Sequence, residues 1–140
     1  MKLEYPALFE QEADGSAWNV RFTDFAEAFT YGVTLEEAAY NAREVLDLTL
    51  ESRLADGETI PYPGTVETEY FFAPSPSIQS AILIHLAREE QHKTLADVAR
   101  ALGTSWPSAA RLEDPRHWPT LRQLDRAAAV LGKRLVLCLE

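Results

Sequence analysis

The first third of the chain alternates apolar and polar residues with the two-residue period of β-strands. Residues 17–22 follow this alternation after the largely apolar stretch at residues 5–10, and Asp14-Gly15 between the two stretches is a pair that tolerates the positive φ of a tight turn. We therefore expect a β-hairpin. A third strand is predicted over residues 26–33, where small and larger residues alternate again.

The pattern then changes to the three- and four-residue spacing of an amphipathic helix. Thr34-Leu35-Glu36-Glu37 matches a capping box, in which the Thr34 hydroxyl accepts the Glu37 N–H and the Glu37 carboxylate reaches back. Apolar residues recur to Leu54, and Asp56-Gly57 ends the predicted helix. Alternation over residues 65–72 predicts a fourth strand.

Two prolines in Ala73-Pro74-Ser75-Pro76 indicate an extended linker between two parts of the chain. We expect one domain over residues 1–72, the linker at 73–76, and a second domain over 77–140. Ser77 is the expected N-cap of a helix that runs to Glu90, in which His85 is interpreted as a packed, hydrogen-bonded histidine.

Three further short helices are predicted in the second domain. Thr94 opens the first of them, and Gly103 supplies the positive φ of a tight exit. Ser105 caps the next helix, and Pro107 suits its first turn, where no N–H is needed. A second capping box at residues 120–123 starts the last helix. The predicted class is thus α+β, a β-β-β-α-β domain followed by a helical domain.

Residues 134–139 are apolar at nearly every position, which is typical of a strand buried on both faces. No other strand is predicted in this domain. We therefore expect the segment to pair with its copy in a second chain and form a homodimer, or a higher homo-oligomer. The dimerisation residues would be Leu135, Val136, Leu137, Cys138 and Leu139.

Charge is divided unequally between the two parts. The 140 residues carry a formal net charge of −9. Residues 1–76 hold 4 basic and 15 acidic residues, a balance of −11, whereas residues 77–140 hold 9 basic and 7 acidic residues, a balance of +2. This asymmetry indicates different partners for the two parts, a basic macromolecule for the first and a polyanion for the second.

Composition also restricts the class of protein. The apolar runs are far shorter than the roughly 20 residues of a membrane span, and the first residues do not form a signal peptide, so we expect a cytoplasmic protein without a membrane partner. Cys138 is the single cysteine and is interpreted as a small apolar residue. We expect no metal and no cofactor.

The motifs of the first domain resemble the HicB antitoxin family. The similar stretches are residues 18–25, 34–38, 41–44 and 56–61. The resemblance implies a partial RNase H-like fold that binds and blocks a small, basic, mRNA-cleaving HicA toxin. The family usually has a Leu-Pro-Gly-Cys type turn where this chain has Phe25-Ala26-Glu27-Ala28. On this resemblance we place the toxin-binding residues at Asp24, Phe25, Glu27, Phe29 and Tyr31.

An RNase H-like fold raises a nuclease as an alternative, because active members place several carboxylates around two metal ions. Asp14, Asp24, Glu27 and Glu37 are the acids available for such a cluster. Asp14 lies in the predicted turn and Glu37 in the predicted cap, which leaves too few ligands on neighbouring strands. We expect no catalytic residues and no enzymatic activity.

Two helices joined at Gly103 are the elements of a helix-turn-helix, whose second helix enters the major groove of DNA. Residues 94–105, 109–113 and 124–128 resemble the phage-repressor (Xre/Cro) family. Leu95 stands where many members have a phosphate-binding glutamine. The expected DNA-binding residues are Lys93, Thr94, Ser105, Trp106, Pro107, Ser108, Arg111 and Arg116.

The function predicted from these features is an antitoxin that neutralises a HicA-like toxin and represses its own operon by binding operator double-stranded DNA. The alternative is a solitary transcriptional regulator whose first domain binds another protein or a small ligand. A neighbouring reading frame for a small basic protein would favour the first of these.

Overall fold

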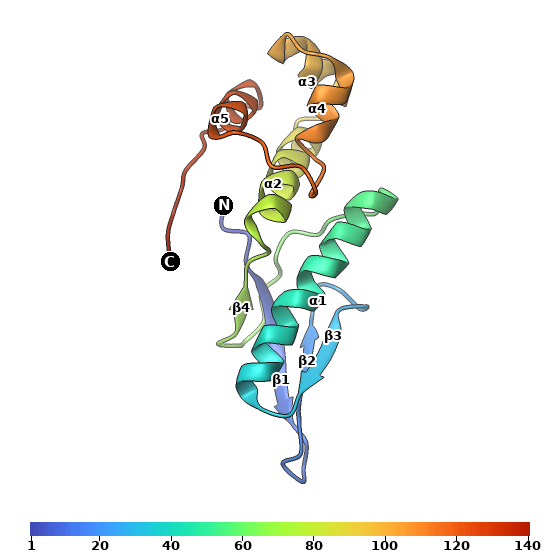
Figure 1. Ribbon diagram of the computed structural model, residues 1–140, viewed down its shortest axis with the longest axis vertical. Helices are drawn as coiled ribbons and strands as arrows, with labels where there is room; N and C mark the ends of the chain where they lie inside the picture. Colours follow the sequence, from blue (N-terminus) through green and yellow to red (C-terminus); the bar gives the residue numbers. More distant parts are fainter. The chain divides into compact units, whose positions relative to one another are not determined.

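The computed structural model describes all 140 residues and divides them into two compact units, Met1–Ser75 and Pro76–Glu140. The first unit contains a four-stranded antiparallel sheet and one long helix, and the second contains four helices (Figure 1). The predicted α+β class is confirmed.

The sheet of the first unit has the strand order β3-β2-β1-β4. Its strands are β1 (Tyr5–Gln11), β2 (Trp18–Phe22), β3 (Phe29–Gly32) and β4 (Phe71–Phe72). β1 and β2 form the predicted hairpin. Gly15 turns the chain with a φ of 75°, and the Asp14 carboxylate accepts the N–H of Ser16, so the turn chemistry expected from the sequence is confirmed.

β3 begins later than the sequence predicts because the preceding residues form a tight turn. The Ala28 N–H donates to the Phe25 carbonyl at 3.1 Å, which closes this turn. The Phe22 N–H then donates to the Ala28 carbonyl at 3.0 Å and begins the pairing of β2 with β3. Ala26 and Glu27 therefore belong to the turn.

The fourth strand is much shorter than predicted, because a side chain interrupts its pairing with β1. Tyr70 accepts a bond from the Ala7 N–H at 3.0 Å, as in a regular ladder. The return bond is absent because the Thr68 hydroxyl lies between the Tyr70 N–H and the Ala7 carbonyl, at 3.2 and 2.8 Å. Strand pairing is consequently limited to Phe71–Phe72, and the prediction of a strand over residues 65–70 is wrong.

Helix α1 (Leu35–Asp56) packs against β2 and β3 and covers one face of the sheet (Figure 1). The Thr34 hydroxyl accepts the Glu37 N–H at 3.1 Å, but no bond returns from the Glu37 carboxylate, so only half of the predicted capping box forms. Gly57, with a φ of 68°, ends the helix as predicted. The helix face on the sheet consists of buried residues, Ala38, Ala42, Leu46, Thr49 and Leu50.

Gly32 allows this close packing. A Cβ at that position would lie 2.3 Å from the Ala38 backbone nitrogen, a distance at which atoms overlap. The strand and the helix can therefore lie this close only because residue 32 has no side chain.

The four helices of the second unit are α2 (Pro76–Glu90), α3 (Leu95–Leu102), α4 (Trp106–Arg111) and α5 (Leu121–Val130). α2 begins two residues before the predicted start at Ile78, because Pro76 is its first residue, where a missing N–H costs nothing. Ser77 is therefore inside the helix, buried, and not its N-cap. Only residues 73–75 separate β4 from α2.

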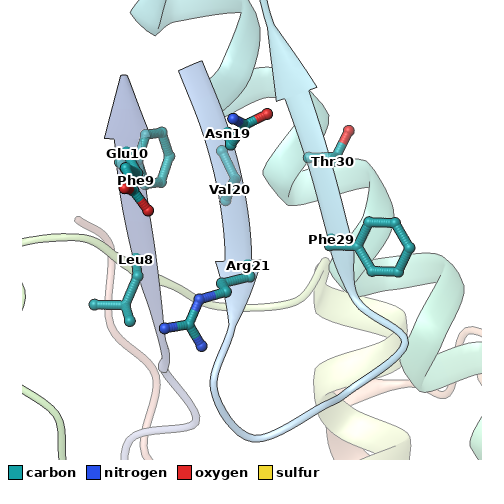
Figure 2. Close-up of a pocket in the computed structure, with 8 residues that line it drawn as sticks. All are labelled: Leu8, Phe9, Glu10, Asn19, Val20, Arg21, Phe29 and Thr30. Atoms are coloured by element: carbon teal, nitrogen blue, oxygen red, sulfur yellow. The ribbon is translucent and has the colours of Figure 1, made fainter. Parts of the chain in front are cut away.

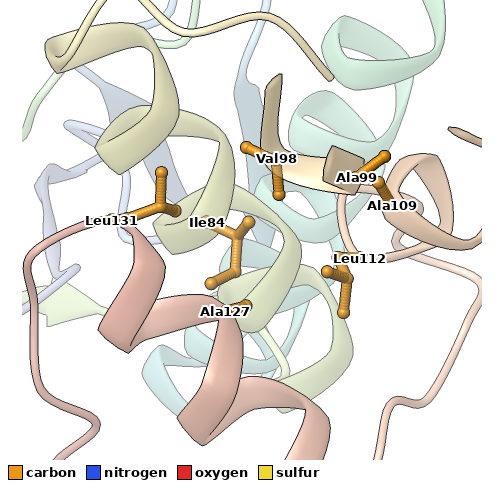
Figure 3. Packing of buried hydrophobic residues seen from close by; sticks show 7 residues of the cluster. All are labelled: Ile84, Val98, Ala99, Ala109, Leu112, Ala127 and Leu131. Carbon is orange, nitrogen blue, oxygen red and sulfur yellow. The ribbon is translucent and has the colours of Figure 1, made fainter. Parts of the chain in front are cut away.

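The remaining caps of this unit are those predicted. Thr94 and Thr120 each form a complete capping box, with Asp97 and Gln123, and the Ser105 hydroxyl caps α4. Gly103 ends α3 with a φ of 66°. Figure 3 shows the core between the helices, formed by Ile84, Val98, Ala99, Ala109, Leu112, Ala127 and Leu131.

Residues 133–140 form neither helix nor strand. A strand needs a partner for its backbone groups, and this single chain offers none. Leu135 is half-buried, but the apolar side chains after it are exposed, with exposed fractions of 70% for Val136, 66% for Leu137 and 101% for Leu139. The strand predicted over residues 134–139 is therefore absent from the isolated chain, and its pairing between two copies stays a prediction.

Candidate functional site

One face of the sheet carries no helix. Val20 and Phe22 of β2 are each 2% exposed on the face that α1 covers. Because side chains alternate along a strand, Asn19 and Arg21 lie on the opposite face, and both are exposed. Strand pairing aligns them with side chains of β1 and β3 in two rows, Leu8–Arg21–Phe29 and Glu10–Asn19–Tyr31. These six residues are called the uncovered sheet face below.

The uncovered sheet face contains a shallow hollow lined by residues of β1, β2 and β3 (Figure 2). Phe29 at its edge and Tyr31 further along β3 are 68% and 60% exposed. Large aromatic side chains on the surface of a small unit are typical of contact sites for other macromolecules. Phe29 and Tyr31 are thus the two residues of the predicted toxin-binding set that are free to contact a partner.

The other three residues of that set hold the first unit together. Phe25 is 1% exposed, and its ring centroid lies 4.9 Å from that of Tyr5. The Asp24 carboxylate accepts the Gly64 N–H at 3.0 Å and thereby fixes the loop that follows α1. Phe25 offers no surface to a partner in this structure, and the contact of Asp24 with a toxin stays a prediction.

Glu27 forms a two-point ion pair with Arg53 near the end of α1. The Arg53 Nε and Nη2 atoms donate to the Glu27 carboxylate at 2.8 and 2.9 Å. The hydrogen bond from Arg53 lowers the pKa of Glu27 below its ordinary value, so the pair is charged at neutral pH. Arg53 also lies 5.1 Å above the Phe25 ring. Glu27 is therefore engaged in joining the β2–β3 turn to the helix.

These contacts also bear on the nuclease alternative. Asp14, Asp24 and Glu27 accept bonds from Ser16, Gly64 and Arg53, and Glu37 lies exposed in the first turn of α1. No group of three or more His, Cys, Asp or Glu residues is arranged to hold a metal ion.

None of the helices has both the length and the apolar character to cross a bilayer.

Helices α3 and α4 of the second unit pack together across the turn at Gly103. Ala109 and Leu112 of the α4 region are buried, whereas Trp106, Pro107 and Arg111 are exposed. The exposed fraction of Trp106 is 55%, and the guanidinium of Arg111 makes no hydrogen bond or ion pair. The outward side of α4 therefore presents an aromatic ring, a proline ring and a free guanidinium.

The remaining predicted DNA-binding residues differ in how free they are. The Lys93 ammonium donates to the Val130 carbonyl at 3.1 Å, and the Thr94 hydroxyl accepts the Asp97 N–H. Ser105 and Ser108 share a hydrogen bond between their hydroxyls at 3.0 Å. Arg116 is exposed, and its guanidinium has no partner. Of this set, Arg111 and Arg116 are the cations available to a phosphate or a base.

An ion cluster that the sequence did not reveal fixes the end of α4. Glu113, whose side chain is 9% exposed, accepts bonds from His85 Nδ1 at 2.7 Å and from Arg88. Arg88 Nη1 also donates to the Lys93 carbonyl in the α2–α3 turn. The interpretation of His85 as a packed, hydrogen-bonded residue is confirmed. The cluster attaches both ends of the α3–α4 pair to α2.

Leu8, Glu10 and Arg21 were also missed as candidate functional residues. The alternation of β1 and β2 gives each strand one exposed face, but it does not say which residues of two strands lie opposite each other. The register Leu8–Arg21 would have required the length of the hairpin loop, which the sequence predicts only approximately.

The two units together define a class of protein: an acidic αβ module with an uncovered aromatic surface, followed by a small helical unit whose charges are more positive. A family model described as the HicB-like antitoxin of bacterial toxin–antitoxin systems matches residues 4–76. The chain belongs to the HicB-like antitoxin family.

Curated relatives extend this likeness over almost the whole chain. Antitoxin HicB 1 of Photorhabdus laumondii subsp. laumondii is 31% identical over 138 residues, which are 99% of this chain and 88% of the relative. Antitoxin HicB 2 of the same organism is 32% identical over 96% of this chain and 95% of the relative. Antitoxin HicB of Escherichia coli K12 is 29% identical over 96% and 98%. The similarity therefore includes both units.

Proposed function

We propose that this chain is an antitoxin that binds and neutralises a HicA-like mRNA-cleaving toxin through its first unit and represses its own operon by binding operator DNA through its second. Family membership supports an antitoxin. The observation that carries the toxin-binding half is the uncovered sheet face, where Phe29 and Tyr31 are exposed on a unit with a balance of −11.

Neutralisation would be steric and electrostatic. The field of the acidic unit attracts a basic partner, and aromatic side chains then contribute contact area at the surface of the complex. A toxin covered in this way has no access to RNA. The chain itself performs no catalysis in this scheme.

DNA binding is proposed for α3 and α4, arranged as a helix-turn-helix. The exposed side of α4 would enter the major groove, where Arg111 can donate to guanine or to a phosphate, and Trp106 can contact the apolar methyl group of thymine. We propose that Arg116 contacts a phosphate of the DNA backbone. Two copies joined by residues 135–139 would provide the two-fold arrangement that a palindromic operator requires.

Both proposed partners, an mRNA-cleaving toxin and operator DNA, are found in the bacterial cytoplasm, where we place the action of the chain. The test of the toxin-binding half uses a HicA-like toxin, to be sought as a small basic protein encoded in the reading frame next to this chain's gene. Co-expression should restore the growth of cells that the basic protein arrests, and the purified proteins should form a complex on size exclusion. Phe29→Ser and Tyr31→Ser together should abolish the rescue while the thermal midpoint of the chain stays unchanged.

A matched control changes Tyr40→Ser, which removes an aromatic residue that is 60% exposed on α1, the helix that covers the other face of the sheet. Rescue that survives the double substitution would refute the assignment of the toxin to this face. A chain that retains its promoter fragment but forms no complex with the basic protein is instead a solitary regulator.

A further inference from the structure

The uncovered sheet face carries one positive charge, that of Arg21, although the first unit as a whole is strongly acidic. Two arginines of this unit are engaged with their own fold. Arg43 lies over the Phe72 ring at 5.4 Å, and Arg53 pairs with Glu27. Arg21 is exposed on β2, and its guanidinium makes no hydrogen bond or ion pair.

The strand register surrounds Arg21 with apolar side chains. Leu8 of β1 and Phe29 of β3 lie directly opposite it on either side. In Figure 2 the guanidinium of Arg21 extends over β1 beside Leu8, and the Phe29 ring lies at the outer edge of β3. Leu8 is half-buried, so a partner seated here would exclude water from the neighbourhood of the guanidinium.

A second exposed and unpaired charge lies on the same face of the sheet. Glu10 is two residues beyond Leu8 on β1 and is exposed, and its carboxylate makes no hydrogen bond or ion pair. It is diagonal to Arg21 across the β1–β2 pair, a separation of roughly 7–8 Å between Cα atoms. Asn19, which lies opposite Glu10, is held by Glu12 at 2.6 Å. The two opposite charges are neighbours and yet remain unpaired.

This surface carries one unpaired positive charge, one unpaired negative charge and apolar side chains next to both. It is complementary to a partner that has an acidic group and a basic group at the matching positions. A carboxylate over Arg21 and a basic side chain over Glu10 would satisfy both charges, and the apolar contacts would strengthen each pair by removing water. A partner rotated on this face would place like charges together, which is unfavourable. The pattern therefore sets orientation as well as affinity.

We propose that Arg21 and Glu10 form a two-charge recognition site on the uncovered sheet face, in which Arg21 takes a carboxylate and Glu10 a basic side chain of the toxin. This inference rests on the proposed toxin partner. It adds that an otherwise basic toxin carries an acidic residue at the centre of its contact surface with the antitoxin.

The test is Arg21→Glu in the full chain, measured as the dissociation constant with the same basic HicA-like protein. Attraction between an acidic and a basic protein alone predicts equal or tighter binding, because the substitution makes the first unit more acidic. The two-charge site predicts the opposite, a weakening of about tenfold or more. Arg21→Gln, which removes the charge without reversing it, should weaken binding in the same direction but less.

Glu10→Arg should also weaken binding by about tenfold or more, and Glu36→Arg is its matched control. Glu36 is exposed in the first turn of α1, on the layer that covers the other face, so its reversal changes the net charge equally but not the site. Equal effects of Glu10→Arg and Glu36→Arg would overturn the inference. So would an Arg21→Glu chain that binds as tightly as the unchanged one.

The unchanged chain distinguishes the two proposals. If it forms no complex with the basic protein, the proposed toxin-binding function fails. If it forms a complex that Arg21→Glu and Arg21→Gln leave intact, only the two-charge site fails. All of these residues are exposed and free of internal partners, so each variant should keep the thermal midpoint of the unchanged chain.

Discussion

Arg88 donates two hydrogen bonds to the carboxylate of Glu113, with N–O distances of 2.6 and 2.9 Å. The two residues belong to α2 and to the segment directly after α4, and Arg88 also reaches the Lys93 carbonyl between α2 and α3. A single arginine thus joins three separate parts of the second unit.

Replacing Glu113 should destabilise the second unit, because it leaves Arg88 charged and half-buried without its partner. We expect Glu113→Ala to lower the free energy of unfolding by about 3 kcal/mol, measured by urea denaturation. Glu89→Ala is the control, since Glu89 is exposed and lies 3.5 Å from His85. Equal losses in the two variants would contradict a structural role for the Arg88–Glu113 pair.

The same carboxylate should make the second unit sensitive to acid. Burial raises the pKa of Glu113, but hydrogen bonds from His85 and Arg88 and the charge of Arg88 outweigh this effect and leave the pKa below its ordinary value of 4.5. A carboxyl whose pKa is lowered by folding stabilises the protein fully above its unfolded pKa, and this stabilisation is lost as the pH falls through the folded pKa.

We therefore expect the unfolding free energy to fall below about pH 4.5 more steeply in the unchanged chain than in Glu113→Gln, which cannot titrate. Urea denaturation at micromolar concentration between pH 3 and pH 6 measures the difference. Parallel curves for the two proteins would show that the cluster does not contribute to acid sensitivity.

Gly32 should be the least replaceable glycine of the first unit. Gly32→Ala places a Cβ against the backbone of Ala38 and should cost about 3 kcal/mol, because backbone atoms must move. Gly57→Ala is the comparison, since it meets no atom within 4 Å and suffers only from its positive φ, at about 1 kcal/mol. Thermal melting of both variants measures the order, and a smaller effect at Gly32 would contradict the close approach of β3 and α1.

Arg111 should affect DNA binding without affecting stability, because it has no partner within the chain. With a duplex selected from random DNA by the purified protein, Arg111→Ala should reduce the slope of log affinity against log salt by about 1 if the residue neutralises a phosphate. Arg111→Lys should keep that slope and lose base discrimination if the contact is a two-point bond to guanine. Unchanged binding in both variants would remove Arg111 from the interface.

Residues 133–140 should control self-association, which follows from the pairing predicted for this apolar segment. Removing them should convert a dimer into a monomer in sedimentation experiments and weaken retention of a palindromic duplex. Leu137→Glu should act in the same direction, because a charge within a buried strand pair is unfavourable. A truncated chain that still sediments as a dimer would contradict this role.

Local chemistry could be predicted from the sequence and long-range register could not. The turn at Gly15 and the caps at Thr94, Ser105 and Thr120 each depend on residues within four positions, so their side-chain chemistry identifies them. Thr68 is the counterexample, because its hydroxyl acts on Ala7, which is 61 residues away in the chain. No local pattern indicates that contact.

The same contrast between local patterns and long-range contacts holds for the residues of the two candidate surfaces. Exposure of Phe29 and Tyr31 follows from alternation within a single strand, but the burial of Phe25 depends on Tyr5 and Arg53. In the second unit, Arg111 was identified from its helix position, whereas the attachment of Glu113 depends on α2. Residues that depend on tertiary neighbours were therefore the ones missed or misassigned.

The exposed apolar side chains on and directly after β3 also affect the solubility of the chain when it has no partner. Phe29, Tyr31 and Val33 keep exposed fractions of 68%, 60% and 59%, so we expect the net charge of −9, through mutual electrostatic repulsion, to limit association of the free protein through this surface. That repulsion vanishes near the isoelectric point of about 4.8. Without a partner, a solution of the protein should become turbid when acid or high salt removes the electrostatic repulsion between molecules. A partner bound over these side chains should keep the solution clear.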